Sequence, residues 1–256
     1  MDFQRLVRRL KRWKDVYGWK HQCPMCGYRL STFKPYGHDL AVFSEKQVVG
    51  GGVRAQAKCH ICGCLDRERL IFMYLKHHTS FLTTPSNILH FAPEAVLGRR
   101  LRANKNNNYI TADIVPEKAD LRIDMTDIPF AGNEFDLIIA NHILEHIPDD
   151  KKALSELKRV LKNNSGRAIL QVPISLNSEL TYEDATIDSD EGRLQAFGQE
   201  DHIRIYGQDY PLKLQQAGFN VEIFDWKSSN KLNPNQKNKF GFIEEEKIYI
   251  VKNIAS

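Results

Sequence analysis

The chain has 256 residues, of which 42% are hydrophobic and 27% are charged, an ordinary composition for a globular protein. This length allows one full hydrophobic core and a small accessory unit. No apolar run approaches the ~20 residues that cross a bilayer, and basic residues interrupt the N-terminus where a signal peptide would need its apolar core. We therefore expect a cytoplasmic protein.

The net charge of +4 comes from the first 20 residues. This segment carries seven Lys or Arg and two Asp side chains, which leaves the rest of the chain with 29 basic and 30 acidic residues. Its apolar residues recur at helical spacing, so we expect a basic amphipathic helix over residues 1–20 that ends at Gly18. Such a helix either packs on the protein body or contacts an anionic membrane surface or a nucleic-acid backbone.

Two short cysteine motifs follow, CPMCG at residues 23–27 and CHICG at residues 59–63. Two residues between thiols let one tight turn aim both sulfurs at a single ion, and four thiolates complete a tetrahedral zinc site. A cytosolic location disfavours disulfides. Because protein ligands would fill every position, we expect a structural zinc ion. The predicted ligands are Cys23, Cys26, Cys59 and Cys62, with His60 and Cys64 as alternatives, although Cys64 is expected to pack instead.

The 32 residues between the motifs exceed the ~15–20 that are usual in zinc ribbons. Three strand-like pieces at 32–36, 40–44 and 53–58, with three glycines at 50–52, predict one or two hairpins in this gap. We expect a zinc-ribbon-like unit over 21–64. The apolar spacing of LDRERLIFMYLKHH then predicts a helix in a connecting segment, 65–84.

From residue 85 to 256, strand-like runs alternate with helical segments, which predicts an α/β domain. The apolar runs at 135–140 and 168–172 are bridged by a helix, as in a crossover unit of a parallel sheet. In such sheets ligands bind beyond the carboxyl ends of the strands. The loop after the first strand has Ala92-Pro93-Glu94 in place of GxGxxG, which argues against NAD or FAD.

Polar side chains follow the other predicted strands at the same rim. Asp113 ends the second strand, 19 residues after Glu94, where a carboxylate can accept both ribose hydroxyls of a nucleoside. Asp124 and Met125 end the third strand, and Asn141 and His142 end the fourth. The positions of these residues predict a nucleoside-binding rim.

The stretch IPFAGNEFDLIIANHILEH, followed by a helix and RVLKNNSG, resembles the class I S-adenosylmethionine (SAM)-dependent methyltransferases of the type 11 kind. The resemblance covers residues 85–252 and implies a Rossmann-like, seven-stranded sheet flanked by helices, with a last, antiparallel strand at EEKIYIVKN. It implies SAM as cofactor. Asp124 and Met125 would then contact adenine, and Glu94 would lie near the ammonium and sulfonium charges. The implied cofactor residues are Ala92, Glu94, Asp113, Asp124, Met125, Asn141 and His142.

Residues 142–146 are expected to open the next helix, with His142 and His146 on one face and Glu145 beside them. The irregular stretch 175–204 is expected to cover the site as a lid. His202, Arg204 and Tyr206 are expected to point back at its mouth. The mechanism that we expect is direct displacement by an acceptor oxygen or nitrogen, with His142 or His202 as catalytic base.

The resemblance leaves the acceptor open. Zinc-containing relatives include ribosomal RNA methyltransferases and proteins that look like enzymes of surface-polysaccharide or small-molecule pathways. We expect a small-molecule or glycan-like acceptor. The alternatives are a zinc-finger rRNA or tRNA methyltransferase, an adaptor that binds RNA or protein through a degenerate cofactor fold, and an enzyme that contacts the membrane through residues 1–20.

Overall fold

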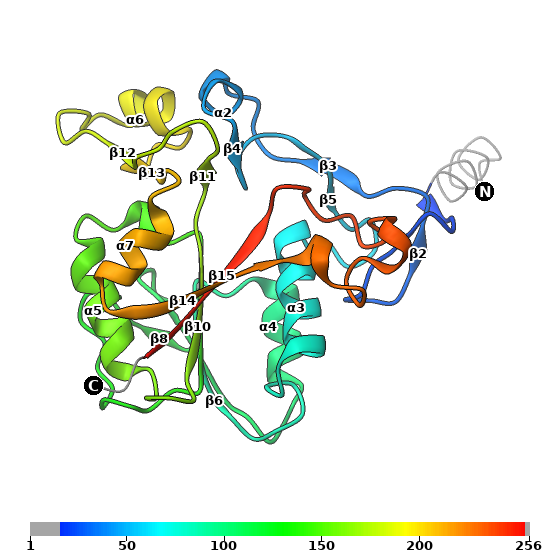
Figure 1. The fold of residues 1–256 in the computed structure, drawn as a ribbon, viewed down its shortest axis with the longest axis horizontal. Coiled ribbons are helices and arrows are strands. Elements are labelled where there is room, and N and C mark those ends of the chain that lie inside the picture. The colour runs from blue at the N-terminus through cyan, green and yellow to red at the C-terminus, as the bar shows by residue number, and fades with distance from the viewer. Residues whose placement is uncertain (1–15, 254–256) are drawn as a thin grey trace.

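A central seven-stranded sheet organises the computed structural model, which describes residues 16–253 (Figure 1). The strand order across the sheet is β14-β15-β10-β9-β6-β7-β8. In chain order the strands are β6 (Asn87–Phe91), β7 (Asn108–Asp113), β8 (Leu121–Arg122), β9 (Leu137–Asn141), β10 (Arg167–Gln171), β14 (Phe219–Asp225) and β15 (Lys247–Asn253).

All neighbouring pairs from β10 to β8 are parallel, whereas β15 runs antiparallel to both β10 and β14. The predicted α/β class, the Rossmann-like seven-stranded sheet and the antiparallel last strand are therefore confirmed. The central strands β9 and β10 are buried on both faces, as their continuous apolar runs predict.

Two helix layers cover the sheet (Figure 1). On one face, α3 (Asp66–His78) and α4 (Ala95–Arg102) pack over Ile88, Ile139 and Ile169. On the other face, α5 (Asp150–Val160) and α7 (Tyr210–Gln216) pack over Ile138 and Leu170. Successive residues of one strand point to opposite faces, so Ile138 and Ile139 belong to different layers of the core.

The N-terminal module consists of short elements around the cysteines. They are β1 (His21–Gln22), β2 (Arg29–Leu30), β3 (Lys34–Tyr36), α2 (Ala41–Glu45), β4 (Val48–Val49) and β5 (Arg54–Lys58). The predicted hairpin is confirmed, since β3 pairs antiparallel with β5. The strand predicted at 40–44 is wrong, because this stretch forms α2 and buries Val42 and Phe43 side by side. The basic helix predicted at 1–20 lies almost wholly outside the described residues.

Arg69 of α3 ties this module to the end of the chain. Its guanidinium is fully buried and donates to five backbone carbonyls. The carbonyls of Phe240 and Gly241 lie in the segment after β14. Those of Gln56 and Ala57 belong to β5, and that of Cys64 directly follows the second cysteine motif. The sequence does not point to this role, because an arginine on a mixed helix usually faces solvent.

The stretch predicted as an irregular lid is partly regular. It contains β11 (Ile174–Ser175), β12 (Tyr182–Glu183), α6 (Asp190–Phe197) and β13 (Arg204–Ile205). Here β11 pairs with β4 of the N-terminal module, and the ring of Phe43 lies against Gly198 at the end of α6. The stretch is therefore packed on the N-terminal module and is not a free loop.

Three 3₁₀ turns complete the fold: Leu144–His146 (η1), Trp226–Ser228 (η2) and Pro234–Gln236 (η3). Over residues 16–253, the structure has no helix whose length and apolar character would let it span a membrane.

Candidate functional site

The predicted cofactor residues lie at one rim of the sheet. Asp113 ends β7 and Asn141 ends β9, and both strands flank β6. Phe91 of β6 is level with Ala112 on one side and Ala140 on the other, so Ala92 follows between Asp113 and Asn141. Because neighbouring strands lie ~4.8 Å apart, Ala92, Asp113 and Asn141 are next to one another along the rim.

The first loop takes a conformation that usually requires glycine. Ala92 has a φ of +42°, in the left-handed region that glycine favours. Its N–H donates to the Ala112 carbonyl at 2.8 Å, which holds the loop against β7. Glu94 is then the N-cap residue of α4. The loop thus turns sharply without the glycines of the usual motif.

The Glu94 carboxylate faces inward and is held by three groups. His90 Nε2 lies 3.0 Å away, Asn141 Nδ2 donates at 2.9 Å, and Arg67 Nε of α3 lies at 3.8 Å. Burial alone would raise the pKa of Glu94, but His90 and the other partners outweigh burial and lower it below its ordinary value. Asn141 Oδ1 is buried and makes no hydrogen bond with the described residues.

The other two acids are more open. Asp113 accepts a hydrogen bond from the Val115 N–H, and Asp124 accepts from both the backbone and the hydroxyl of Thr126. Met125 differs from them, because its side chain is only 3% exposed and packs in the core. Any contact between Met125 and a bound nucleoside is therefore made by its backbone or by the small exposed part of its side chain.

The prediction that residues 142–146 open a helix is wrong. His142 has a φ of +54°, only a 3₁₀ turn follows, and α5 starts at Asp150. Pro148 and the N-cap Asp149 account for this late start, since proline disfavours helix in the residue before it and Asp149 accepts from the Lys152 N–H at 2.9 Å. His142 and His146 consequently do not share a helix face.

Instead of sharing a helix face, these residues form a cluster of three imidazoles, from His142, His146 and His202, around the carboxylate of Glu145. Glu145 is fully buried, with Oε1 at 3.4 Å from His142 Nδ1 and 3.9 Å from His202 Nε2. The His146 and His202 rings meet edge to face, with centroids 4.5 Å apart.

Burial dominates the pKa shifts of Glu145, His142 and His202. It raises the pKa of Glu145 to about 8 and, with His146, lowers the pKa of His202 to about 4. Burial, reinforced by Arg67 and Arg54, holds the pKa of His142 well below its ordinary value.

Arg204 and Tyr206 do not point at the mouth of the site as predicted. Arg204 donates to the carbonyls of Leu144, Ile147 and Pro148, and Tyr206 donates to the Asp150 carboxylate at 2.8 Å. Both side chains hold the 144–150 turn in place.

A polar bridge that the sequence did not suggest crosses the rim to β15. Gln171 ends β10 beside Asn141, and its side-chain amide donates to Glu246 Oε1 at 2.9 Å. Glu246 Oε2 is buried without a hydrogen-bond partner, and burial, reinforced by Asp66, raises the pKa of Glu246 to about 7. In the sequence, the one sign of this bridge is the polar residue Gln171 near the end of the apolar run 168–172.

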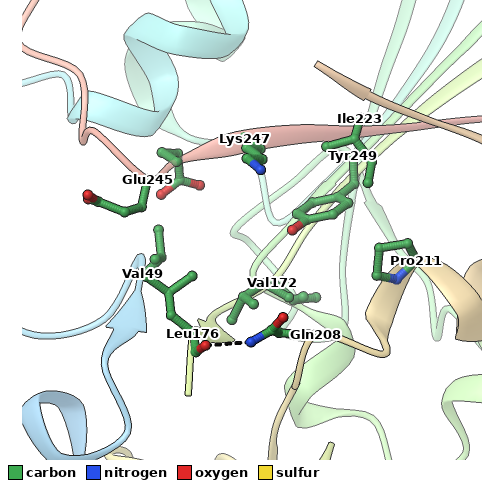
Figure 2. Close-up of a pocket in the computed structure, with 11 residues that line it drawn as sticks. Val49, Val172, Leu176, Gln208, Pro211, Ile223, Glu245, Lys247 and Tyr249 are labelled. Carbon is green, nitrogen blue, oxygen red and sulfur yellow. Dashed lines mark hydrogen bonds between the residues drawn. The ribbon is translucent and has the colours of Figure 1, made fainter. Parts of the chain in front are cut away.

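A cavity of about 360 Å³ lies beyond this bridge, between β4, β15 and the start of α7 (Figure 2). Figure 2 shows Tyr249 projecting from β15 into it, with Gln208 and Leu176 on the opposite side, joined by a hydrogen bond of 2.5 Å. Aliphatic and polar side chains share the lining, and the polar groups come from Gln208, Glu245, Glu246, Lys247 and Tyr249. A second hollow of about 400 Å³ shares Val49, Leu176 and Glu245 with it.

The four predicted metal ligands come together in the N-terminal module. One sulfur from each of Cys23, Cys26, Cys59 and Cys62 lies within 4.8 Å of the others. The two motifs have the same local geometry: Gly27 and Gly63 both have a φ of +80°, and each donates its N–H to the first cysteine of its motif. The cluster is compatible with structural zinc. Cys64 is fully buried, 3.5 Å from Cys23 Sγ, and no disulfide joins any of the five.

Comparison with known proteins gives one family match, in which residues 91–169 match the model of a methyltransferase domain. No curated protein matches the sequence significantly.

Solved structures resemble the fold at low identity. A SAM-dependent methyltransferase from Archaeoglobus fulgidus is 14% identical over 73% of this chain and 94% of that one, with a TM-score of 0.47. YcgJ from Bacillus subtilis is 15% identical over 66% and 93%, with a TM-score of 0.42. The Burkholderia thailandensis 1,6-didemethyltoxoflavin-N1-methyltransferase, bound to S-adenosylhomocysteine, is 13% identical over 72% and 76%, with a TM-score of 0.46. Structural similarities at this level do not indicate a substrate.

Proposed function

We propose that this chain, whose residues 91–169 match a methyltransferase domain, uses SAM to methylate an oxygen or nitrogen atom of a small-molecule or glycan-like acceptor. The observation that supports this acceptor class is the cavity of Figure 2, which is small, has both aliphatic and polar lining residues, and is acidic rather than basic.

The rim residues fit the cofactor. Asp113 has carboxylate lone pairs left for ribose hydroxyls, and Asp124 is exposed at the next strand end, where an exocyclic amine would meet it. Glu94 and the orphaned Oδ1 of Asn141 are acceptors suited to an ammonium group. When bound, SAM supplies an electrophilic methyl group on a sulfonium. Ala92, Glu94, Asp113, Asp124, Asn141 and His142 are the residues that we propose to hold it, with Met125 through its backbone.

The acceptor cavity offers hydrogen-bonding groups on an apolar wall, the usual make-up of a small-ligand site. Two carboxylates and one ammonium line it, a balance that disfavours the many phosphates of an RNA backbone. The Tyr249 hydroxyl and the Gln208 amide suit the hydroxyl or amine groups of a sugar-like molecule. This balance supports a glycan-like or other small acceptor over RNA.

For proton removal we propose His142, on geometry. Its Nδ1 faces Glu145, and its buried Nε2 makes no hydrogen bond within the described part of the chain, so a ring lone pair is free beside the rim. His202 lies behind Glu145, is 1% exposed and is not placed to reach an acceptor.

The proposal is tested by a tritium-transfer screen with labelled SAM over sugar nucleotides, lipid-linked glycans, small hydroxy and amino compounds, and RNA. We expect transfer to a member of the first three classes. Transfer to RNA alone would overturn the acceptor class but leave the methyltransferase activity intact. In that screen, Tyr249→Phe should raise the acceptor KM more than it changes kcat.

The cofactor side is tested separately by calorimetry with S-adenosylhomocysteine. Asp113→Ala should weaken binding by about tenfold to a hundredfold, since it removes hydrogen bonds to a charged group. The matched control is Asp136→Asn, which removes a carboxylate that pairs with Lys162 just before β9, at the opposite end of the same sheet. Absence of binding by the unaltered protein would favour the adaptor alternative.

A further inference from the structure

A second group of metal-ligating side chains lies apart from the cysteines. It consists of Glu145, His146 and His202, and one ligand atom of each lies within 4.8 Å of the others. Glu145 and His146 belong to the turn η1, and His202 immediately precedes β13. The Ile203 N–H donates to the Glu145 carbonyl at 3.0 Å, so the backbone holds these two segments together.

Two members of this group, Glu145 and His202, lack the partners that buried polar atoms normally have. Glu145 is 0% exposed, and neither of its carboxylate oxygens makes a hydrogen bond with any residue from 16 to 253. His202 is 1% exposed, and within the same range neither of its ring nitrogens makes one. Burying such groups without partners is costly, because each loses the water that it would bind when exposed. These orphaned atoms converge on the same small region.

The nearby Lys and Arg side chains do not pair with the Glu145 carboxylate. Over residues 16–253, no Lys or Arg nitrogen lies within 4.0 Å of the Glu145 carboxylate, whose nearest titratable neighbours are the imidazoles of His142 and His202. The guanidinium of Arg204 is directed at backbone carbonyls and at Glu183 instead. The carboxylate is therefore poorly compensated by the protein alone.

One ring nitrogen of His146 already has partners. Its Nδ1 lies 3.2 Å from both the carbonyl and the carboxylate of Asp201. Histidine ligands commonly donate one ring N–H to a carboxylate or carbonyl, which leaves the other nitrogen for the ion. Here that leaves Nε2 of His146.

We propose that Glu145, His146 and His202 bind a divalent transition-metal ion. Two imidazoles and one carboxylate form a ligand set suited to zinc and similar metals, with bonds of about 2.0–2.2 Å. The separation of 3.9 Å between Glu145 Oε1 and His202 Nε2 exceeds that of two ligands on one tetrahedral ion by roughly 0.5 Å, so a small contraction closes the site. Three protein ligands leave a further position for water. His202 is then a ligand and not a proton acceptor.

The test uses the full-length protein without SAM or acceptor, so it does not depend on the proposed function. The protein is stripped with a chelator, reloaded with Zn²⁺, and analysed for metal by mass spectrometry. We expect two equivalents of zinc per chain, one at the thiolates and one at this group. One equivalent would overturn the proposal.

Substitutions test whether Glu145 binds the second zinc ion. Glu145→Gln keeps the shape of the side chain and should lose one equivalent while keeping the other; retention of both would contradict the proposal. The matched control, His77→Gln at the end of α3, should keep both. With Co²⁺, the unaltered protein should show visible bands from a nitrogen and oxygen site besides the thiolate charge-transfer bands. A spectrum with thiolate bands alone would overturn the proposal even if Glu145→Gln failed to fold.

Discussion

Gly50 of the N-terminal module lies against the ring of His142 at the sheet rim. A Cβ built on Gly50 would lie 2.9 Å from Cε1 of His142 and 3.4 Å from its Nε2. Glu246 Oε2 lies 3.8 Å from the same point. The module that carries the cysteines therefore lines the region between the predicted cofactor rim and the proposed acceptor cavity.

Gly50→Ala should impair both stability and activity. The φ of Gly50 is +84°, so alanine there would cost about 1–2 kcal/mol in backbone strain, and the new methyl would displace the His142 ring. A shift of that size at a proposed base should lower kcat by roughly tenfold to a hundredfold. Denaturant unfolding and steady-state kinetics measure the two effects.

Gly218→Ala is the control for backbone strain. Gly218 has a φ of +86°, and its nearest neighbour is the flexible end of Lys158, which can move away. The Gly218→Ala variant should lose about as much stability as Gly50→Ala but keep the kcat of the unaltered protein. Equal losses of kcat in both variants would show that strain, not the contact with His142, is responsible.

Removing one cysteine ligand should destabilise the whole chain. Met25 accepts a hydrogen bond from Arg100 of α4, and Cys64 accepts one from Arg69 of α3, so the motifs are bonded to helices of the main domain. Cys26→Ser should lose one zinc equivalent and lower the free energy of unfolding by about 2 kcal/mol, a fall in Tm of about 4–8 °C. Calorimetry and metal analysis check this. Cys64→Ala should keep its zinc, and loss of zinc there would make Cys64 a ligand.

Arg69→Met should be among the most destabilising substitutions. Methionine fills a similar volume, but five carbonyls lose their donor at once. The expected loss is about 3 kcal/mol or more in the free energy of unfolding. Arg29→Met, whose guanidinium lies over the exposed ring of Trp19, should cost less than about 1 kcal/mol. Similar costs for both would mean that the Arg69 contacts contribute little.

Glu246 should make stability depend on pH. Burial raises its pKa to about 7, so the folded state binds the proton more tightly than the unfolded state, whose pKa is near 4.5. Its contribution is present below pH 4.5 and is lost as the pH rises to about 7. Glu246→Gln should therefore gain stability relative to the unaltered protein over this interval, by on the order of 2 kcal/mol. Urea unfolding at several pH values measures the difference, and Glu244→Gln at an exposed neighbour controls for the lost charge. A constant difference across the interval would contradict the prediction.

Local sequence patterns predicted much of the fold. Continuous apolar runs such as 135–140 predict strands buried on both faces, and the strand–helix alternation predicts a parallel sheet with Asp113 and Asn141 at one rim. The CxxCG spacing likewise predicts that four sulfurs meet. Each of these features depends on residues close together in the chain, so the sequence by itself determined them.

Contacts between distant segments were decided by the tertiary structure. The strand propensity of 40–44 is overridden because Val42 and Phe43 pack into a small cluster with Phe197 and Ile205. Gln171 meets Glu246 across 75 residues, and Glu145 meets His202 across 57, which no local period encodes. Even the turn at His142 depends on where β9, β10 and the N-terminal module meet. Burial and pairing are properties of the packed chain, so only the folded structure shows which polar residues are brought together without water.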